Sequence, residues 1–175
     1  ARLMEEMLGE VNGSHTGAYY RAPGGDQTAA LGILFDNSYT GDGFKVAEVL
    51  KQSPLNARSK KIEVGSVLTA INGTALDAGT NRHALLKNKV GKRTRLTFKP
   101  ADGDAFDVVI KPVTTRQQSG WMYERWVESR RKAVDELSGG RLGYVHVPNM
   151  DDRTYRSVYR DLFGRAMNKE AVVVD

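Results

Sequence analysis

The sequence predicts an α+β fold, in which a central module of short strands with two helices lies between a helical segment and a segment of α/β type. Three observations predict this order. Apolar residues recur at helical spacing before residue 12, short apolar runs alternate with turn residues between 29 and 110, and helix and strand patterns alternate after residue 120. With 40% hydrophobic and 27% charged residues, the chain of 175 residues can bury a core.

The first segment is predicted to be a helix over residues 3–11, because its apolar side chains follow helical spacing. Asn12 and Gly13 are expected to end it, since glycine readily adopts the left-handed conformation of a helix C-cap. Ser14 and His15 follow, and residues 21–26 are predicted to form a linker because they contain a Pro-Gly-Gly run.

The middle segment has the rhythm of a compact module of short strands. Ser53 and Pro54 are predicted to begin a short helix, and residues 81–89 a second one. Asn72-Gly73 is typical of a hairpin turn. The strands are predicted at residues 29–35, 44–50, 66–71, 95–98 and 106–110.

The last segment alternates helices and strands. A long helix is predicted over residues 120–137, and a second helix is predicted from Asp151 through Met167. Strands are predicted at residues 141–147 and 171–174. Since the second strand is apolar and rich in valine, it is expected to lie in a parallel sheet that is buried on both faces and continues after residue 175.

Composition excludes several classes of site. Without cysteine the chain has no disulfide, no thiolate zinc site and no cysteine nucleophile, and no cofactor is predicted. The net charge of +5 is modest and lacks the dense basic stripe of nucleic-acid binders, so no nucleic-acid partner is expected. No stretch approaches the roughly 20 apolar residues of a membrane-spanning helix.

The amino-terminal residues carry Glu5 and Glu6 where a signal peptide would be apolar, and the first residue is not methionine. We therefore expect the chain to be cut from a longer protein. The compartment is left open.

Residues 31–35 and 64–74 carry a resemblance to PDZ domains, with Ser66 where the family has an aspartate. The resemblance implies that an extended peptide adds a strand to a sheet edge and that loop amides hold its carboxylate. It places the peptide-binding residues at Leu31, Gly32, Ile33 and Leu34. The alternative is that this run is only a core strand.

The flanking segments resemble tricorn-type serine peptidases, which belong to the class of C-terminal processing peptidases. Residues 7–15 are similar to the segment that carries the catalytic histidine, and residues 139–150 to the strand that opens the catalytic core. The resemblance implies three domains: the end of a helical subdomain at 1–24, a PDZ-like domain at 25–113 and the start of an α/β catalytic core at 114–175.

In this resemblance, His15 is the general base and Ser14 belongs to the relay that orients it. The nucleophilic serine, the glutamate and the oxyanion loop would lie after Asp175, so the chain alone is expected to be inactive. The implied partners are a peptide or protein substrate and the rest of the catalytic domain, with a homo-oligomer left open. The alternative is a non-catalytic PDZ module for peptide binding or scaffolding.

The other two histidines are assigned more ordinary roles. His83 lies on the predicted helix 81–89, where it is either solvated or contacts the penultimate side chain of a bound peptide. His146 is predicted to be a half-buried, hydrogen-bonded residue. Trp121 and Trp126 are expected to pack the long helix onto the core.

Overall fold

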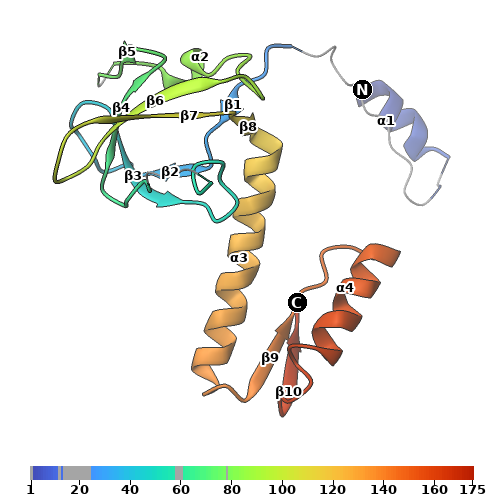
Figure 1. Cartoon of the computed structure of the whole chain (residues 1–175). Coiled ribbons are helices and arrows are strands. Elements are labelled where there is room, and N and C mark those ends of the chain that lie inside the picture. Colours follow the sequence, from blue (N-terminus) through green and yellow to red (C-terminus); the bar gives the residue numbers. More distant parts are fainter. Residues whose placement is uncertain (1, 12, 14–24, 58–60, 78) are drawn as a thin grey trace.

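The computed structural model describes the whole chain except residues 1, 12, 14–24, 58–60 and 78. Helix α1 (Arg2–Gly9) comes first and stands apart from the strand-rich domain that follows (Figure 1). That domain leads into the long helix α3 (Thr115–Leu137), which ends at a small unit of two strands and one helix. None of the described helices has the length and apolar character needed to cross a membrane.

The strand-rich domain is built on an antiparallel sheet with the strand order β2-β3-β4-β6-β7, to which β5 is added beside β4. A second pair joins β1 to β8, so the first and last strands of the domain lie together. The strands are β1 (Ala29–Ala30), β2 (Ile33–Phe35), β3 (Phe44–Val49), β4 (Val67–Ile71), β5 (Thr74–Ala75), β6 (Thr94–Lys99), β7 (Phe106–Ile110) and β8 (Val113–Thr114).

Side chains from these strands form one hydrophobic core. Phe98, Leu68 and Leu96 are fully buried at its centre. Strands β6 and β7 alternate buried and less buried positions, as expected for strands that present one face to a core. The predicted hairpin turn is confirmed, because Asn72 and Gly73 have φ angles of 52° and 85° and connect β4 to β5.

Three predicted elements of this domain differ from the structure. The strand expected over 29–35 is broken into β1 and β2 at Gly32, whose φ is 72°. The prediction of a helix beginning at Ser53 is wrong, because residues 54–57 form turns. In these turns the side-chain amide of Asn56 donates a hydrogen bond to the carbonyl of Leu50. The missing helix is thus replaced by side-chain hydrogen bonds to the backbone.

The second predicted helix of the domain is much shorter than expected. Helix α2 spans Arg82–Leu85, and the Asn81 side chain caps it by accepting a hydrogen bond from the His83 amide at 3.0 Å. It ends early because the following backbone pairs elsewhere: the amide of Asn88 donates to the carbonyl of Gln27. Residues 86–89, which apolar spacing predicts as helical, therefore lie outside α2.

Helix α3 begins five residues earlier than the predicted position 120. Thr114 and Gln117 form a capping box there: each side chain accepts a hydrogen bond at 3.0 Å from the other residue's amide. The Thr-x-x-Gln pattern at residues 114–117 is the local signal for this helix start, and apolar spacing does not contain it.

The last unit consists of β9 (Leu142–Val145), α4 (Asp152–Phe163) and β10 (Ala171–Val174). The two strands pair in parallel, which confirms the prediction of a parallel arrangement. The predicted burial of the second strand on both faces depends on further strands of the sheet and stays a prediction; among the described residues nothing covers Val173 and Val174, which are 40% and 64% exposed. Helix α4 ends at Phe163, four residues before the predicted end at Met167.

Helix α3 is attached to both neighbours. On the side of the strand-rich domain, Arg125 on α3 makes a two-pronged ion pair with Glu48 on β3, with N–O distances of 2.7 and 2.8 Å. On the other side, Asp135 on α3 pairs with Lys169 at 2.6 Å. Through these contacts α3 connects the two folded parts.

Candidate functional site

The loop between β1 and β2 contains the residues predicted to hold a peptide carboxylate. The Gly32 amide donates a hydrogen bond of 2.8 Å to the side-chain oxygen Oε1 of Gln118, on α3. The Gly32 carbonyl accepts from the amide of Leu50 at 2.9 Å. Both polar groups of the glycine backbone are therefore engaged within the chain.

Ser53 holds this loop from the other side. Its hydroxyl donates to the Leu31 carbonyl at 3.1 Å, and the side chain is buried. A Cβ atom placed on Gly32 would lie 2.7 Å from Ser53 Oγ and 2.8 Å from Ser53 Cβ. Position 32 therefore requires glycine for two reasons: its left-handed φ and the close approach of Ser53.

The four predicted peptide-binding residues take different places. Leu31 and Ile33 are buried in the hydrophobic core, Gly32 is bound to Gln118, and Leu34 is half-buried. Strand β2 nevertheless stands at one end of the strand order. One of its edges is therefore not paired within that sheet, as peptide addition to a sheet edge requires.

The far end of β2 is covered by a cation. The rings of Phe35 and Phe44 lie 5.7 Å apart, and the Arg82 guanidinium lies 5.0 and 4.5 Å from their centroids. Burial lowers the pKa of Arg82 from its ordinary value. These three side chains line a hollow of about 210 Å³ together with Asp36 and Asp77, so the hollow has an aromatic wall, one positive charge and two carboxylates.

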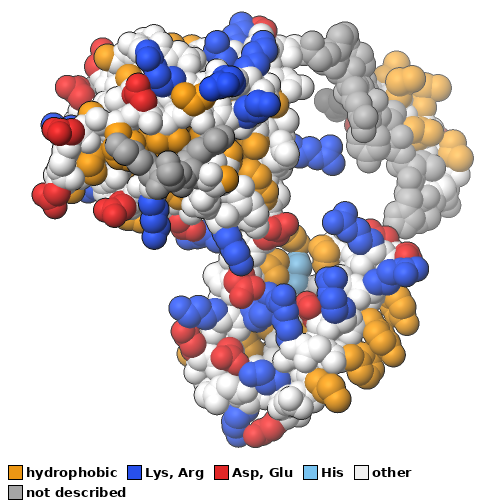
Figure 2. All heavy atoms as spheres, in the orientation of Figure 1, with side chains coloured by type: hydrophobic (Ala, Val, Ile, Leu, Met, Phe, Trp, Pro, Cys, Tyr) orange, Lys and Arg blue, Asp and Glu red, His pale blue; other side chains and the backbone are white. Residues whose placement is uncertain are grey.

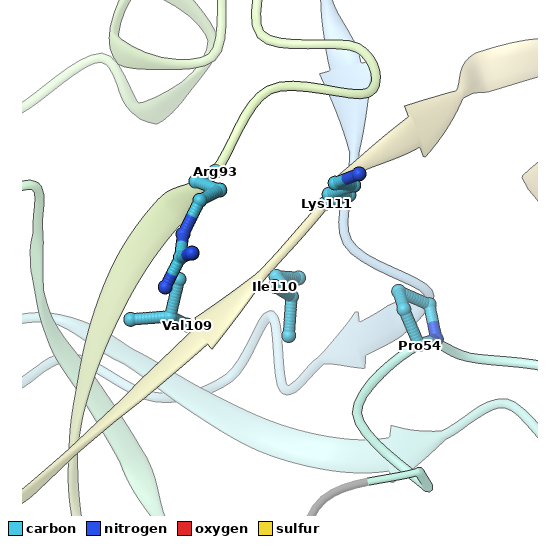
Figure 3. A pocket seen from close by; sticks show the side chains of 5 residues that line it. All are labelled: Pro54, Arg93, Val109, Ile110 and Lys111. Atoms are coloured by element: carbon cyan, nitrogen blue, oxygen red, sulfur yellow. The ribbon is translucent and has the colours of Figure 1, made fainter.

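A separate hollow of about 260 Å³ lies along β7 (Figure 3). Arg93 and Lys111 supply two positive charges, and Val109, Ile110 and Pro54 supply an apolar floor. None of the four predicted peptide-binding residues contributes to it. Its two cationic side chains suit a small anionic group.

His146 lies in a cluster at the carboxyl ends of β9 and β10. Its Nε2 atom is hydrogen-bonded to the hydroxyl of Tyr123, and its Nδ1 atom lies 3.3 Å from a carboxylate oxygen of Asp175. The Tyr144 ring is stacked on it, and the Trp126 ring meets it edge-on with centroids 5.5 Å apart. The prediction of a half-buried, hydrogen-bonded His146 is confirmed.

Tyr144 and Asp175 change each other's acidity in this cluster. Burial raises the pKa of Tyr144 to about 12, and its hydrogen bond to Asp175 adds to the effect. That hydrogen bond holds the pKa of Asp175 below its usual range, and His146 acts in the same direction. The polar partners of His146 are a tyrosine hydroxyl and an aspartate carboxylate. Neither partner is a serine that the imidazole could activate as a nucleophile.

Ser14 and His15, the predicted catalytic pair, lie outside the described residues. His83 is described and is exposed on α2. Across the part of the chain that the structure describes, no group of three or more potential metal-ligating side chains is found.

The sequence analysis missed Gln118, Arg82, Tyr123 and Asp175 as parts of these sites. Gln118 is 86 positions from the amide it binds, and Tyr123 is 23 positions from His146. Contacts of such separation leave no local pattern in a single sequence. The capping box at Thr114 was the one available signal, because it fixes where α3 begins and hence where Gln118 lies.

Comparison with known proteins assigns the strand-rich domain. Residues 32–115 match the family model of the tricorn protease PDZ domain. A structure of the tricorn protease superposes on 85% of this chain and 15% of its own, with a TM-score of 0.71 and 24% identity, and this likeness shows a shared fold.

Two curated proteins are similar over nearly the whole chain. The identity is 35% over 185 residues to tricorn protease homolog 1 of Streptomyces coelicolor and 30% over 184 residues to the tricorn protease homolog of Saccharolobus solfataricus. Each alignment covers 99% of this chain and 17% of the relative, so the chain spans about a sixth of their length. The predicted resemblance to tricorn-type peptidases is confirmed: residues 32–115 match the tricorn protease PDZ domain, and they lie within a segment that is similar to tricorn protease homologues over nearly its whole length.

Proposed function

We propose that this chain is a segment of a serine peptidase of the tricorn type, which hydrolyses peptide bonds through an acyl-enzyme. The observation that carries the proposal is the similarity to tricorn protease homologues over 99% of the chain. The order of the folded parts supports it: a helix comes first, then the PDZ domain, then a parallel βαβ unit. We assign the domains as 1–24, 25–113 and 114–175.

In this proposal His15 is the general base. Its imidazole takes the proton of a serine hydroxyl as that oxygen attacks the peptide carbonyl, and it later gives the proton to the leaving amine. Ser14 supports the imidazole by a hydrogen bond. The serine nucleophile, the glutamate and the oxyanion donors would come from residues that follow this segment.

The role of the PDZ domain in this proposal is to position the neighbouring parts. Gln118 and Arg125 attach α3 to the PDZ domain, at Gly32 and Glu48 respectively. Asp135 and Arg131 attach the same helix to the last unit, at Lys169 and Asp161. A helix held at both ends would keep the α/β part at a fixed distance from the PDZ core.

The test is peptide hydrolysis by the full-length protein. His15→Ala is expected to abolish turnover, whereas Ser14→Ala should only weaken it, because the histidine transfers the proton and the serine supports it. His83→Ala is the matched control and should leave the rate unchanged, since His83 is exposed on α2. Rates at the wild-type level in both the His15 and Ser14 variants would contradict the assignment.

The chain of 175 residues should by itself be inactive on peptide substrates. No Gly-x-Ser-x-Gly elbow is present in the sequence, and His15 would have no serine to deprotonate. Loss of one member of such a catalytic group typically removes several orders of magnitude in rate. Turnover by the purified chain that disappears in His15→Ala would show that the nucleophile lies within these residues.

A second candidate function is peptide binding by the PDZ domain. The unpaired edge of β2 favours it, because a peptide could add there as a further strand. The hydrogen bond from Gly32 to Gln118 opposes it, since a peptide carboxylate would have to displace the glutamine oxygen. Binding in this proposal is therefore weak and in competition with the chain's own side chain.

A further inference from the structure

The hollow along β7 contains two positive charges and no negative one. Arg93 and Lys111 are both exposed, and the other residues that line the hollow are Pro54, Val109 and Ile110. None of the ion pairs between described residues includes either cation. Figure 2 shows that Lys and Arg side chains, rather than acidic ones, gather over the end of β7 near β8.

Strand pairing places these two cations opposite each other. In the antiparallel pair of β6 and β7, Thr94 faces Ile110 at the end of the ladder. The next residues outward are Arg93 on one side and Lys111 on the other, so they occupy the following pair of facing positions. Like charges at facing positions of neighbouring strands repel each other and lower stability. The fold thus brings together two positive charges that the described residues do not compensate.

A neighbouring cation on the same strand has the partner that these two lack. The Nε atom of Arg95, on β6, lies 3.8 Å from a carboxylate oxygen of Asp107, on β7. Opposite charges on paired strands attract, so this pair supports the sheet. At Arg93 and Lys111 the described part of the chain supplies no such carboxylate. An anion from outside the chain can take that place and remove the repulsion.

The apolar part of the hollow selects the kind of anion. Val109 is 37% exposed on β7, and Pro54 is half-buried. Figure 3 shows the side chain of Arg93 extending beside Val109. A bare inorganic anion leaves this apolar surface in contact with water, whereas an anion with an aliphatic body covers it and gains from its burial. The hollow therefore favours a carboxylate attached to an aliphatic group.

The size and position of the hollow restrict the ligand further. Its volume of about 260 Å³ is just below the roughly 300–1,000 Å³ of pockets that hold drug-sized ligands, so the aliphatic body has to be short. Strand β7 is the last in the strand order, and no described strand pairs with its outer edge. A ligand can therefore enter from the side of this edge without displacing a strand.

We propose that this hollow binds a single carboxylate carried on a short aliphatic body. The carboxylate lies between the guanidinium of Arg93 and the ammonium of Lys111, and the aliphatic body covers Val109 and Pro54. A guanidinium suits this role because it donates two parallel hydrogen bonds to a carboxylate. The end of a peptide chain and a free aliphatic acid both present this chemistry. The site uses no residue of the loop at Gly32 and does not depend on the proposed peptidase reaction.

Titration of the whole chain followed by NMR tests the site with small probes. Isocaproate is a free aliphatic acid, and N-acetyl-leucine represents the end of a peptide with the same isobutyl group. Both should shift the signals of Arg93 and residues 109–111 with a Kd on the order of millimolar, because the cations are exposed and solvent screens them. N-acetyl-leucine amide lacks the charge and inorganic phosphate lacks the aliphatic body, so each should bind at least roughly fivefold more weakly. The tighter of the two carboxylates identifies the source of the ligand.

Substitutions of exposed cations locate the site. Arg93→Gln and Lys111→Gln should each raise the Kd of isocaproate roughly threefold to fivefold. Lys99→Gln is the matched control, because it removes an exposed cation at the far end of β6 and should leave the Kd unchanged.

A charge reversal separates loss of binding from loss of folding. Lys111→Glu supplies the missing carboxylate opposite Arg93, so it should abolish the shifts caused by isocaproate and raise the urea midpoint of unfolding. The proposal would be overturned by an unchanged Kd in the Arg93 and Lys111 variants, by phosphate that binds as tightly as isocaproate, or by shifts confined to residues 31–35.

Discussion

The side-chain oxygen of Gln118 accepts a hydrogen bond of 2.8 Å from the backbone amide of Gly32, although the two residues are 86 positions apart. The acceptor is a neutral amide oxygen, and it comes from the helix that leaves the PDZ domain. A peptide carboxylate is a stronger acceptor, because hydrogen bonds to charged groups are stronger than those between neutral groups. The loop is therefore satisfied without ligand and is still open to competition.

We predict that Gln118→Ala strengthens the binding of a peptide with a free hydrophobic carboxyl terminus. Removing the competing oxygen leaves the Gly32 amide available, which should lower the Kd roughly fivefold. Titration followed by NMR measures this, with shifts expected in residues 31–35. Gln118→Glu is the matched control, because it keeps an acceptor at the same place.

Amidation of the peptide should cancel the gain in Gln118→Ala, since the charged acceptor is lost. If neither variant shows shifts at millimolar peptide, the loop is not a peptide site. The PDZ domain would then serve only to position α3.

Gly32→Ala should destabilise the PDZ domain more than Gly91→Ala. Both glycines have a similar left-handed backbone, with φ of 72° and 70°, so both variants share a cost of about 1–2 kcal/mol. Only Gly32 has Ser53 within 2.8 Å of the new Cβ, and this overpacking should add about 1–3 kcal/mol. Urea unfolding measures the difference, and equal losses of stability would show that Ser53 moves aside freely.

Tyr144 should make the last unit sensitive to alkali. Its pKa is about 12 in the folded chain and about 10 when unfolded. A raised pKa means that the folded state favours the protonated hydroxyl, so this stabilisation is complete below pH 10 and is lost as pH rises toward 12. Tyr144→Phe should remove this part of the pH dependence of unfolding, whereas Tyr155→Phe on the exposed face of α4 should retain it.

Limited digestion with trypsin should leave a core close to residues 25–113. The PDZ domain has its own hydrophobic core, whereas α3 contains no buried residue and carries many arginines. Mass spectrometry of the products identifies the boundaries. A resistant core that extends through β10 in a demonstrated monomer would show that the last unit is stable as part of the same domain.

The sequence predicted the elements whose signals are local. The Asn72-Gly73 turn, the strand β10 and the parallel pairing with β9 all follow from turn chemistry and apolar runs, and the structure confirms them. The resemblance to tricorn-type peptidases also depended on short runs of residues. Local backbone preference and spacing are sufficient for such elements because they act between near neighbours.

The errors occurred where distant residues compete for the same backbone. The predicted helix at 81–89 was cut to four residues because the Asn88 amide pairs with Gln27, 61 positions away. The strand expected over 29–35 was broken at Gly32 because Ser53 and Gln118 hold that loop. Apolar spacing contains no information about such partners.

The sequence by itself determined the order of the parts, the turn at Asn72-Gly73 and the family of the PDZ domain. Only the tertiary structure decided that Gln118 occupies the Gly32 amide and that Tyr123 and Asp175 hold His146. The physical reason is that a hydrogen bond depends on the positions of two atoms in space. For residues far apart in the chain, those positions are set by how the strands and α3 pack together.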